Sequence, residues 1–507
     1  MKKHRKALSI FLVLALCFSF CVPAFATTTV TISNPYENID WSTVNTYKAA
    51  LHSHTNASDG DMTLAQSLER HAEAGFDIVA ITDHGTVDRG WTSDNSTFIR
   101  TLLKIAKRSE GEIEFLGESG TFPNGESYSC CTAQSGDEYL RVDGKKEILR
   151  IPFGIENNAV SVNAHVNSWF VDYCNNSVTT YEDAVKGVDK LGGVSVINHP
   201  GEYTKARYEI RSDKAYSENN FTYRYYINKF SSLLEKYPTC LGIDINSKGD
   251  SRTRFDRILW DRLLERFSAK GDTVFAIASS DAHQLDKIDT GYTLLLMPHL
   301  DSKSAKAALE NGEFFAASHC LGNYEELCEI ASALRRFYGE SELCAAVEKT
   351  VSEMKERIEG IESGKYKATS SIGITYSTLD NDGRLAAKTE PRITKIGVDR
   401  ENGTLSVEAE NAAIVRLISN GKLIDTKRAN EAVFDLNDYA GALGDYVRAE
   451  VFGEGGMIYT QAFLLNESSK NTNESAACKG FFDLGFFDFL FGEFNRLFSA
   501  LGRKAGK

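Results

Sequence analysis

Histidine and carboxylate side chains recur at the ends of short apolar runs, and this pattern constrains the chain more than any other feature. Most of the ten histidines take part, each beside another residue type that binds metals. The motifs are, in chain order, His52-Ser53-His54 with Asp59, Asp83-His84, Glu156, His165, Asn198-His199-Pro200 and Asp281-Ala282-His283. Imidazole and carboxylate ligands together suit Zn, Mn and Fe. The repetition predicts a site that holds several metal ions.

Between about residues 47 and 318, short apolar runs alternate with amphipathic stretches. One helical pattern begins at Thr63 and ends at Gly75, and another begins at Asp301 and ends at Gly312. This alternation predicts an α/β fold with a mostly parallel sheet. The strand-like runs are Ala49–Leu51, Phe76–Ile81, Ile148–Ile155, Val160–Asn163, Val194–Ile197, Leu241–Ile245, Val274–Ala278 and Tyr292–Met297.

The candidate ligands stand at or just past the C-terminal ends of these runs. In a closed α/β barrel such ends converge on one face, where active sites lie, whereas an open sheet would spread them along a crevice. We therefore predict a barrel. The residues in this position are His52, His84, Glu156, His165, His199 and Asp281.

The remainder of the chain has other patterns. Residues 320–365 repeat apolar side chains at helical spacing with a break near Gly339, which predicts a helical hairpin. Residues 390–465 hold short strand-like runs, with a hairpin signal at Asn420-Gly421, and predict a small β-sandwich. The expected organisation is a signal peptide (1–26), a metallohydrolase barrel (27–319), a helical insert (320–389), a β-sandwich module (390–465) and a linker with a Phe-rich tail (466–507).

The first 26 residues indicate export. A basic start with four Lys and Arg residues precedes the apolar run Ala7 to Cys21 and the small-x-small site Ala24-Phe25-Ala26. Removal of these 26 residues would change the formal net charge from −13 to −17. So acidic a protein is not expected to bind duplex nucleic acid, and no Gly-rich phosphate loop is present. We expect a secreted or extracytoplasmic protein, with association with the cell envelope as an open alternative.

The segment Phe481 to Leu501 contains eight phenylalanines interrupted by charged residues. Those charges argue against a membrane-spanning helix. The segment could lie in a membrane interface or pack on the protein itself, and both alternatives remain open.

Four motifs together resemble a known family. Leu51-His52-Ser53-His54-Thr55-Asn56-Ala57-Ser58-Asp59-Gly60, Ile81-Thr82-Asp83-His84-Gly85, Asn198-His199-Pro200-Gly201 and Ser280-Asp281-Ala282-His283 resemble the successive motifs of the PHP (polymerase and histidinol phosphatase) superfamily. The resemblance covers roughly residues 47–318. It implies a distorted seven-stranded, TIM-like β/α barrel, two to three divalent metal ions (Mn, Zn or Fe) and phosphoester hydrolysis by a metal-activated hydroxide.

The resemblance also implies a set of ligands. One metal would take His52, His54, Glu156 and Asp281; a second would share Glu156 and take His165 and His199; a third would take Asp59, His84 and His283. Glu118 is a rival for the bridging position of Glu156. Three carboxylates and three divalent ions would leave the site positively charged, which suits a phosphorylated small molecule or nucleotide as substrate. His52, His54, Glu156 and Asp281 are the residues expected to carry catalysis.

Basic residues downstream of the motifs are candidates for binding phosphate. The main candidates are Arg89, Lys205, Arg207 and Arg257, and the further candidates are Lys248 and Arg252. Asp83 is a candidate for orienting a ligand histidine. Two alternatives to a phosphoesterase stay open. One is an amidohydrolase-like hydrolase on the same metals, and the other is an inert surface-binding protein that acts through the β-module and the tail.

Overall fold

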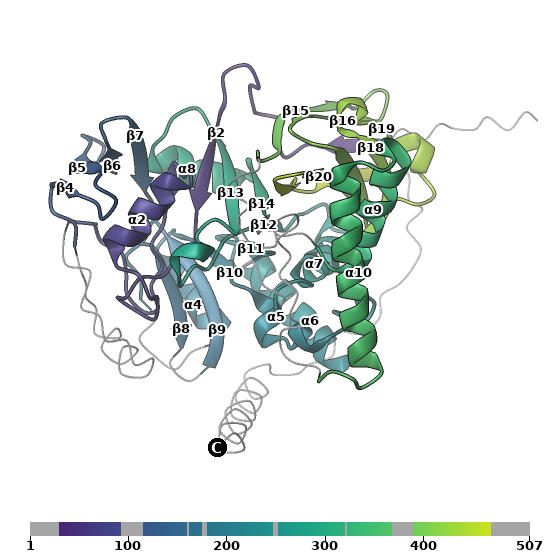
Figure 1. Cartoon of the computed structure of the whole chain (residues 1–507), viewed down its shortest axis with the longest axis horizontal. Coiled ribbons are helices and arrows are strands. Elements are labelled where there is room, and N and C mark those ends of the chain that lie inside the picture. The colour runs from purple at the N-terminus through teal and green to yellow at the C-terminus, as the bar shows by residue number, and fades with distance from the viewer. Residues whose placement is uncertain are drawn as a thin grey trace, which may run out of the picture.

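The computed structural model describes a mixed α/β protein, shown in Figure 1. The predicted signal peptide and the Phe-rich tail lie outside the described residues. The structure describes residues 30–92, 115–159, 162–174, 180–246, 252–319, 322–367 and 389–467.

The strands are β1 (Val30–Ser33), β2 (Asn45–Ala50), β3 (Ile78–Val79), β4 (Ser119–Thr121), β5 (Ser127–Thr132), β6 (Glu138–Val142), β7 (Lys146–Arg150), β8 (Ile155–Ala159), β9 (Val162–Trp169), β10 (Val194–Ile197), β11 (Cys240–Asp244), β12 (Phe275–Ile277), β13 (Gly291–Met297), β14 (Phe314–Ser318), β15 (Arg392–Asp399), β16 (Thr404–Glu410), β17 (Ile414–Ser419), β18 (Lys422–Arg428), β19 (Val433–Asp435), β20 (Tyr446–Gly453), β21 (Gly456–Tyr459) and β22 (Phe463–Glu467). The helices are α2 (Leu64–Glu73), α4 (Tyr181–Lys190), α5 (Pro200–Tyr203), α6 (Phe221–Lys236), α7 (Asp256–Ser268), α8 (Ser302–Asn311), α9 (Tyr324–Tyr338) and α10 (Glu342–Glu362), with 3-10 turns η1 (Ala206–Tyr208), η3 (Leu285–Lys287), η5 (Ala429–Glu431) and η6 (Leu436–Tyr439).

Two sheets surround the centre of the molecule, and they are mixed rather than mostly parallel. Parallel pairs join β2, β3 and β7 in one sheet, and β10, β11 and β12 in the other. Antiparallel pairs come from hairpins between β4 and β7 and between β8 and β9. The strands β9 and β10, β2 and β13, and β13 and β14 also pair antiparallel. Short turns at Gly125, Gly136 and Gly144, all at positive φ, make the hairpins between β4 and β7. The expectation of a mostly parallel sheet was wrong because the chain returns here by hairpins instead of helices.

The predicted run Ile148–Ile155 is two strands, because β7 ends at Arg150 and β8 begins at Ile155. Gly154 lies at the junction, where a Cβ atom would stand 2.3 Å from the carbonyl oxygen of Ile81. Only glycine permits so close an approach of two backbones. This approach lets β8 start beside the segment that carries His84.

The predicted helix ends are confirmed. Thr63 caps α2 by accepting a hydrogen bond from the Gln66 amide, and Gly75 follows the helix at φ 80°. Asp301 caps α8 in the same way, and Gly312 ends it in the left-handed region. The predicted helical hairpin is α9 and α10, which turn at Gly339 (φ 63°).

The C-terminal strands form two layers. One is the three-stranded sheet β15-β16-β19, and the other contains β17, β18, β20, β21 and β22. The second layer is continuous with the central sheet, because β21 pairs with β14. The strand β1 joins it as well by pairing with β22. Hydrogen bonds therefore cross the division predicted between the barrel and the module. In Figure 1 the hairpin α9–α10 stands beside this layer, at the opposite end of the molecule from β4–β6.

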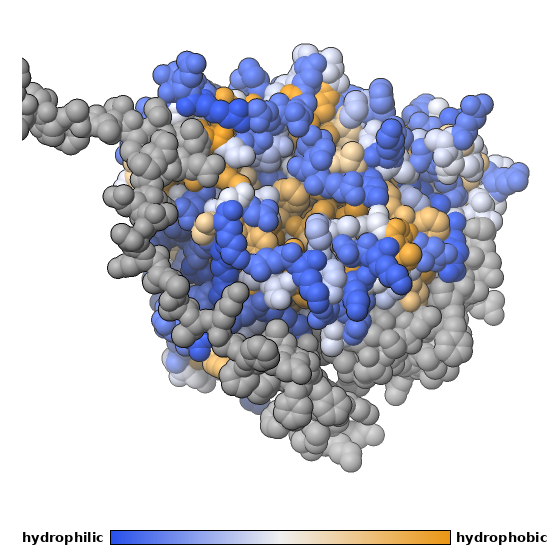
Figure 2. Space-filling model, turned by 180° about the vertical axis from the view of Figure 1, so that it is seen from behind, coloured by the Kyte–Doolittle hydropathy of each residue, from blue (hydrophilic) through white to orange (hydrophobic). Residues whose placement is uncertain are grey.

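The face shown in Figure 2 is mostly hydrophilic, with hydrophobic side chains in its middle. Among the residues that the structure describes, no helix combines the length and apolarity needed to cross a membrane. Cys328 and Cys344 both carry free thiols, and Cys320 lies outside the described ranges.

Candidate metal centre

All nine predicted ligands lie in one region, where seven are buried and Asp59 and His283 are partly exposed. Backbone hydrogen bonds between successive strand ends hold the region together. His54 N–H donates to the Ala282 carbonyl (2.9 Å), and Thr82 N–H donates to that of Ser53 (2.8 Å). Isolated parallel bridges link Ser53 with Ala282 and His84 with Glu156. The segments that carry the motifs therefore hold each other in register at the site.

Four ligand atoms converge at the centre of this region. His52 Nε2 and His54 Nε2 lie 3.1 Å apart. Asp281 Oδ1 is 3.2 and 3.0 Å from these two nitrogens, and Glu156 Oε2 is 3.5 and 3.3 Å from them. The ligands of a tetrahedral ion with bonds near 2.0–2.1 Å lie about 3.3 Å apart. These separations match one shared ion, so the residues fit the metal that the sequence predicts.

The other ligands fall into two adjoining groups. His54, Asp59, His84 and His283 form one, and His84, Glu156 and His165 form the other. His84 thus faces both, with Nδ1 2.9 Å from Glu156 Oε2 and Nε2 3.4 Å from Asp59 Oδ1. The family resemblance had placed it only with Asp59 and His283. His199 lies nearby, its Nε2 3.2 Å from Glu156 Oε1 and 3.6 Å from Asp281 Oδ2.

Glu156, and not its rival Glu118, reaches the centre. Glu156 is fully buried, whereas Glu118 is exposed on the segment before β4. Burial alone would raise the pKa of Glu156, but the positive fields of His165, His84 and His52 hold it well below its usual range. Its Oε2 atom is buried and lies within 3.5 Å of ring nitrogens of His52, His54 and His84. An anionic oxygen in that position can be stabilised by a cation.

The two central histidines respond in opposite directions to the same surroundings. Burial lowers the pKa of His52. Burial also acts to lower that of His54, but hydrogen bonds to Asp281 and Glu156 outweigh it and raise the pKa to about 10. Two imidazolium ions this close would repel each other, so the pair favours a single positive charge. A metal ion supplies that charge without a proton.

Two of the ligand positions have unusual backbone conformations. His199 and Asp281 have φ angles of 27° and 46°, although neither is glycine. Residues in the left-handed region cost free energy and gather at functional sites. Both residues follow directly from buried strands, β10 and β12, and these turns bring their side chains to the centre.

Polar residues around the ligands fix their orientation. Asp83 accepts hydrogen bonds from the Thr55 and Ser58 hydroxyls, each at 2.6 Å, and Ser58 Oγ lies 3.3 Å from His54 Nδ1. Asp83 therefore acts on a ligand histidine through Ser58. Asn198 donates to Glu156 Oε1 at 2.8 Å.

Sequence reasoning missed Tyr203. Its hydroxyl lies 2.8 Å from His165 Nε2. Only its place, four residues after His199, could have indicated it.

The predicted phosphate-gripping residues separate into different settings. Arg257 is buried, donates to Asn246 Oδ1 at 2.8 Å and pairs with Glu326, so the structure places it inside the protein. Arg89 is engaged by both oxygens of Asp172 at 2.9 Å. Lys205 is exposed, and Lys248 lies outside the described residues.

Two arginines meet beside the centre. Arg207 and Arg252 approach Glu202 Oε1 at 3.6 and 3.0 Å. The other oxygen of Glu202 lies 3.7 Å from His199 Nδ1. This partly exposed rim carries two positive charges against one negative charge.

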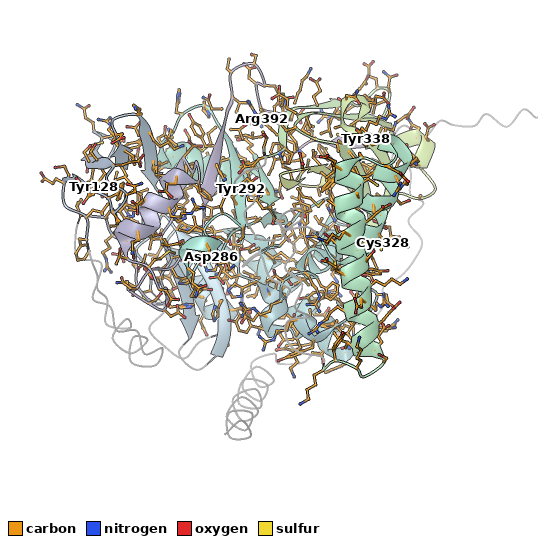
Figure 3. All side chains as sticks on the ribbon, viewed as in Figure 1. Tyr128, Asp286, Tyr292, Cys328, Tyr338 and Arg392 are labelled. Atoms are coloured by element: carbon orange, nitrogen blue, oxygen red, sulfur yellow. The ribbon has the colours of Figure 1, made fainter. Side chains whose placement is uncertain are left out.

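A second polar cluster lies apart from the centre and was not predicted. Asp289, His319 and Glu390 come together, and Lys48 Nζ lies 2.6 Å from both carboxylates. The ammonium group also stands 4.4 Å from the ring centroid of Tyr292, a residue of β13 that is labelled in Figure 3. Lys48 already supplies the positive charge that these two carboxylates need.

No protein-family model and no curated protein matches the chain. A two-domain protein containing a predicted PHP-like metal-dependent phosphoesterase from Bacteroides vulgatus is similar in structure, with 15% identity over 84% of this chain and 88% of that one and a TM-score of 0.34. The lesion-specific endonuclease PfuEndoQ from Pyrococcus furiosus is 12% identical over 52% of this chain and 56% of its own, with a TM-score of 0.28. Similarities this weak leave the function to the residues of the chain itself.

Proposed function

We propose that the chain is a metal-dependent phosphoesterase of the PHP type. The observation that carries the proposal is the set of separations, 3.0 to 3.5 Å, among the ligand atoms of His52, His54, Glu156 and Asp281. Two further groups adjoin this one through shared residues, which favours two to three ions. We further propose that the strand ends form the mouth of a distorted β/α barrel.

The residues divide into distinct roles in this proposal. Divalent ions held here would supply Lewis acidity toward phosphoryl oxygens and lower the pKa of water. His52, His54 and Asp281 hold the central position, while Glu156 faces all the ligand groups. Asn198 and Asp83 keep these side chains in place. The burial of the ligands excludes bulk water, which strengthens each electrostatic contact.

The rim beside His199 supports a phosphorylated substrate. Arg207 and Arg252 lie 3.6 and 3.0 Å from the same oxygen of Glu202, so two guanidinium groups stand together beside His199. A guanidinium can bind two phosphate oxygens at once. We assign substrate contact to Arg207, with Arg252 beside it, and a phosphorylated small molecule or nucleotide as the substrate class.

The test combines metal analysis with activity. Elemental analysis of the purified protein should find two to three Mn, Zn or Fe ions per chain. Hydrolysis should appear in a panel of phosphomonoesters, phosphodiesters and nucleotides supplied with each metal. His52→Ala and Asp281→Ala should abolish turnover while circular dichroism stays unchanged. Less than one metal per chain after metal supplementation, or unchanged turnover in either variant, would overturn the proposal. Cleavage of amides but not of phosphoesters would favour the amidohydrolase alternative.

We also propose export, with the Phe-rich tail as a contact to an anionic membrane or envelope surface. The basis is sequence alone: the signal-like start, and basic residues Arg503, Lys504 and Lys507 after the aromatic segment. Truncation after Ser475 should leave activity and melting temperature unchanged but abolish binding to anionic vesicles. A lower melting temperature with unchanged vesicle binding would show that the tail packs on the protein.

A further inference from the structure

His165 faces the metal centre with the opposite ring nitrogen from His54, His199 and His283, which turn Nε2 toward its carboxylates. Its Nδ1 lies 2.7 Å from Glu156 Oε1. In His283 the Nδ1 atom instead contacts the Asp281 carbonyl (2.9 Å), and Nε2 faces Asp59 Oδ1 at 3.3 Å. His54 is arranged like His283, with Nδ1 toward Ser58 and Nε2 toward Asp281. The Tyr203 hydroxyl lies 2.8 Å from the Nε2 atom of His165.

We propose that Tyr203 is a positioning residue that holds His165 so that Nδ1, rather than Nε2, binds a metal ion shared with Glu156. The inference rests on the proposed function only in requiring a metal at this position. It holds for any reaction that the centre performs. The metal-binding atom of His165 and the role of Tyr203 are the new content.

A hydroxyl suits this place better than a carbonyl or a carboxylate, because it can both donate and accept. Without a metal, His165 Nδ1–H donates to Glu156, and Nε2 accepts a hydrogen bond from Tyr203. With a metal on Nδ1, the ring proton resides on Nε2 and is donated to the Tyr203 oxygen. Tyr203 satisfies each state by rotating its hydroxyl.

The fold holds Tyr203 firmly against its target. It ends the short helix α5, which begins directly after His199. The Tyr203 ring lies 4.7 Å from the ring of His165 and 5.5 Å from that of His199, measured between centroids. Tyr226 donates from its hydroxyl to the Tyr203 carbonyl at 3.4 Å. The aromatic contacts set the plane of the His165 ring, and the hydroxyl sets its tautomer.

The test is Tyr203→Phe, which keeps the ring and removes the hydroxyl. Metal affinities are measured without substrate, by competition with a chromogenic chelator. Loss of an outer hydrogen-bond partner typically weakens metal binding by roughly 10- to 100-fold. We expect the affinity for one metal ion to fall by this factor and the affinities for the other ions to stay the same. The melting temperature of the metal-free protein should be unchanged. Tyr338→Phe, the matched control, removes the hydroxyl of an exposed tyrosine on α9 and should behave as the wild type.

A second measurement keeps the inference testable if Tyr203→Phe misfolds. In ¹⁵N-histidine-labelled, zinc-loaded wild type, the His165 signals, assigned with His165→Gln, should show a protonated Nε2. A protonated Nδ1 in that state, or equal metal affinities in Tyr203→Phe and wild type, would overturn the inference. Full metal binding without phosphoesterase activity would overturn the proposed function instead and leave this inference standing.

Discussion

At the scale of single residues, Glu156 connects the whole centre. Its two oxygens lie within 3.5 Å of nitrogens from His52, His54, His84, His165 and His199. Such a carboxylate can serve more than one ion, because each oxygen has two lone pairs. Removal of its charge should therefore affect several ligands together.

Glu156→Gln should lose at least one metal equivalent and reduce turnover by more than the roughly 100-fold that an outer partner costs. Elemental analysis and steady-state kinetics measure the two effects. Glu118→Gln is the matched control, since it makes the same chemical change on an exposed residue. If Glu118→Gln lost as much metal and turnover as Glu156→Gln, or more, the bridging role would belong to Glu118.

Substitutions of Arg257 and Arg207 should distinguish a structural role from a role in substrate binding. Breaking the buried contact of Arg257 with Glu326 by Arg257→Gln should cost about 3 kcal/mol of unfolding free energy, with KM unchanged. Arg207→Gln should leave stability intact and raise KM for a phosphorylated substrate about tenfold, since a charged hydrogen bond contributes about 1.5 kcal/mol or more. Urea unfolding and kinetics check both. A higher KM in Arg257→Gln than in Arg207→Gln would contradict the assignment.

At the scale of elements, the start of β8 determines where Glu156 stands. Gly154 allows this strand to approach the Ile81 carbonyl, and the Glu156 amide donates to the carbonyl of Thr82 at 3.2 Å. A side chain at 154 would push the strand away from its neighbour. The metal ligand two residues later would move with it.

Gly154→Ala should therefore destabilise the protein by about 1–3 kcal/mol and weaken metal binding as well. Thermal unfolding and chelator competition measure these effects separately. Gly441→Ala provides the control, because a Cβ atom there meets no neighbour within 4 Å. Wild-type metal affinity in Gly154→Ala would show that the close approach does not position Glu156.

At the scale of the whole molecule, the Lys48 cluster joins distant segments. His319 Nε2 lies 3.4 Å from Asp289 Oδ2 and 3.3 Å from Glu390 Oε1, and its Nδ1 contacts the Gly455 carbonyl at 2.6 Å. Burial would lower the pKa of His319, but the two carboxylates raise it to about 9. Burial would raise the pKa of Glu390, but His319 and Lys48 lower it to about 2.

These shifts set a pH window for stability. The contribution of His319 is complete below its unfolded pKa of about 6.5 and is lost as the pH rises through about 9. That of Glu390 is complete above about 4.5 and is lost as the pH falls through about 2. His319→Gln should therefore lower the free energy of unfolding most between about pH 4.5 and 6.5, by at most roughly 3 kcal/mol. The loss should be smallest near pH 10. Urea unfolding of metal-free protein measures the difference from wild type. The exposed His299→Gln is the control, and a pH-independent cost in His319→Gln would refute the coupling.

The sequence predicts what is local in this molecule. The ligands could be found because each stands at the end of its own apolar run, and the helix ends because their caps lie within one turn. The partners of Lys48 could not be found, because Glu390 is 342 positions away and no short pattern relates them. The hairpins between β4 and β7 were missed for a different reason: their half-exposed strands lack long apolar runs. Tyr203 escaped because its role depends on the orientation of a single imidazole.

The pairing of β1 with β22 has a consequence for the order of folding. The Gln461 amide donates to the Tyr36 hydroxyl across 425 positions, and Tyr36 in turn reaches the Phe314 carbonyl. A chain that emerges from its N-terminal side must hold β1 without a partner until β22 has been synthesised. Contacts this distant in sequence slow folding, because a long loop closes before they form. The last described strand thus completes a layer that the first one begins, and an incomplete chain leaves an exposed edge that can pair with other molecules.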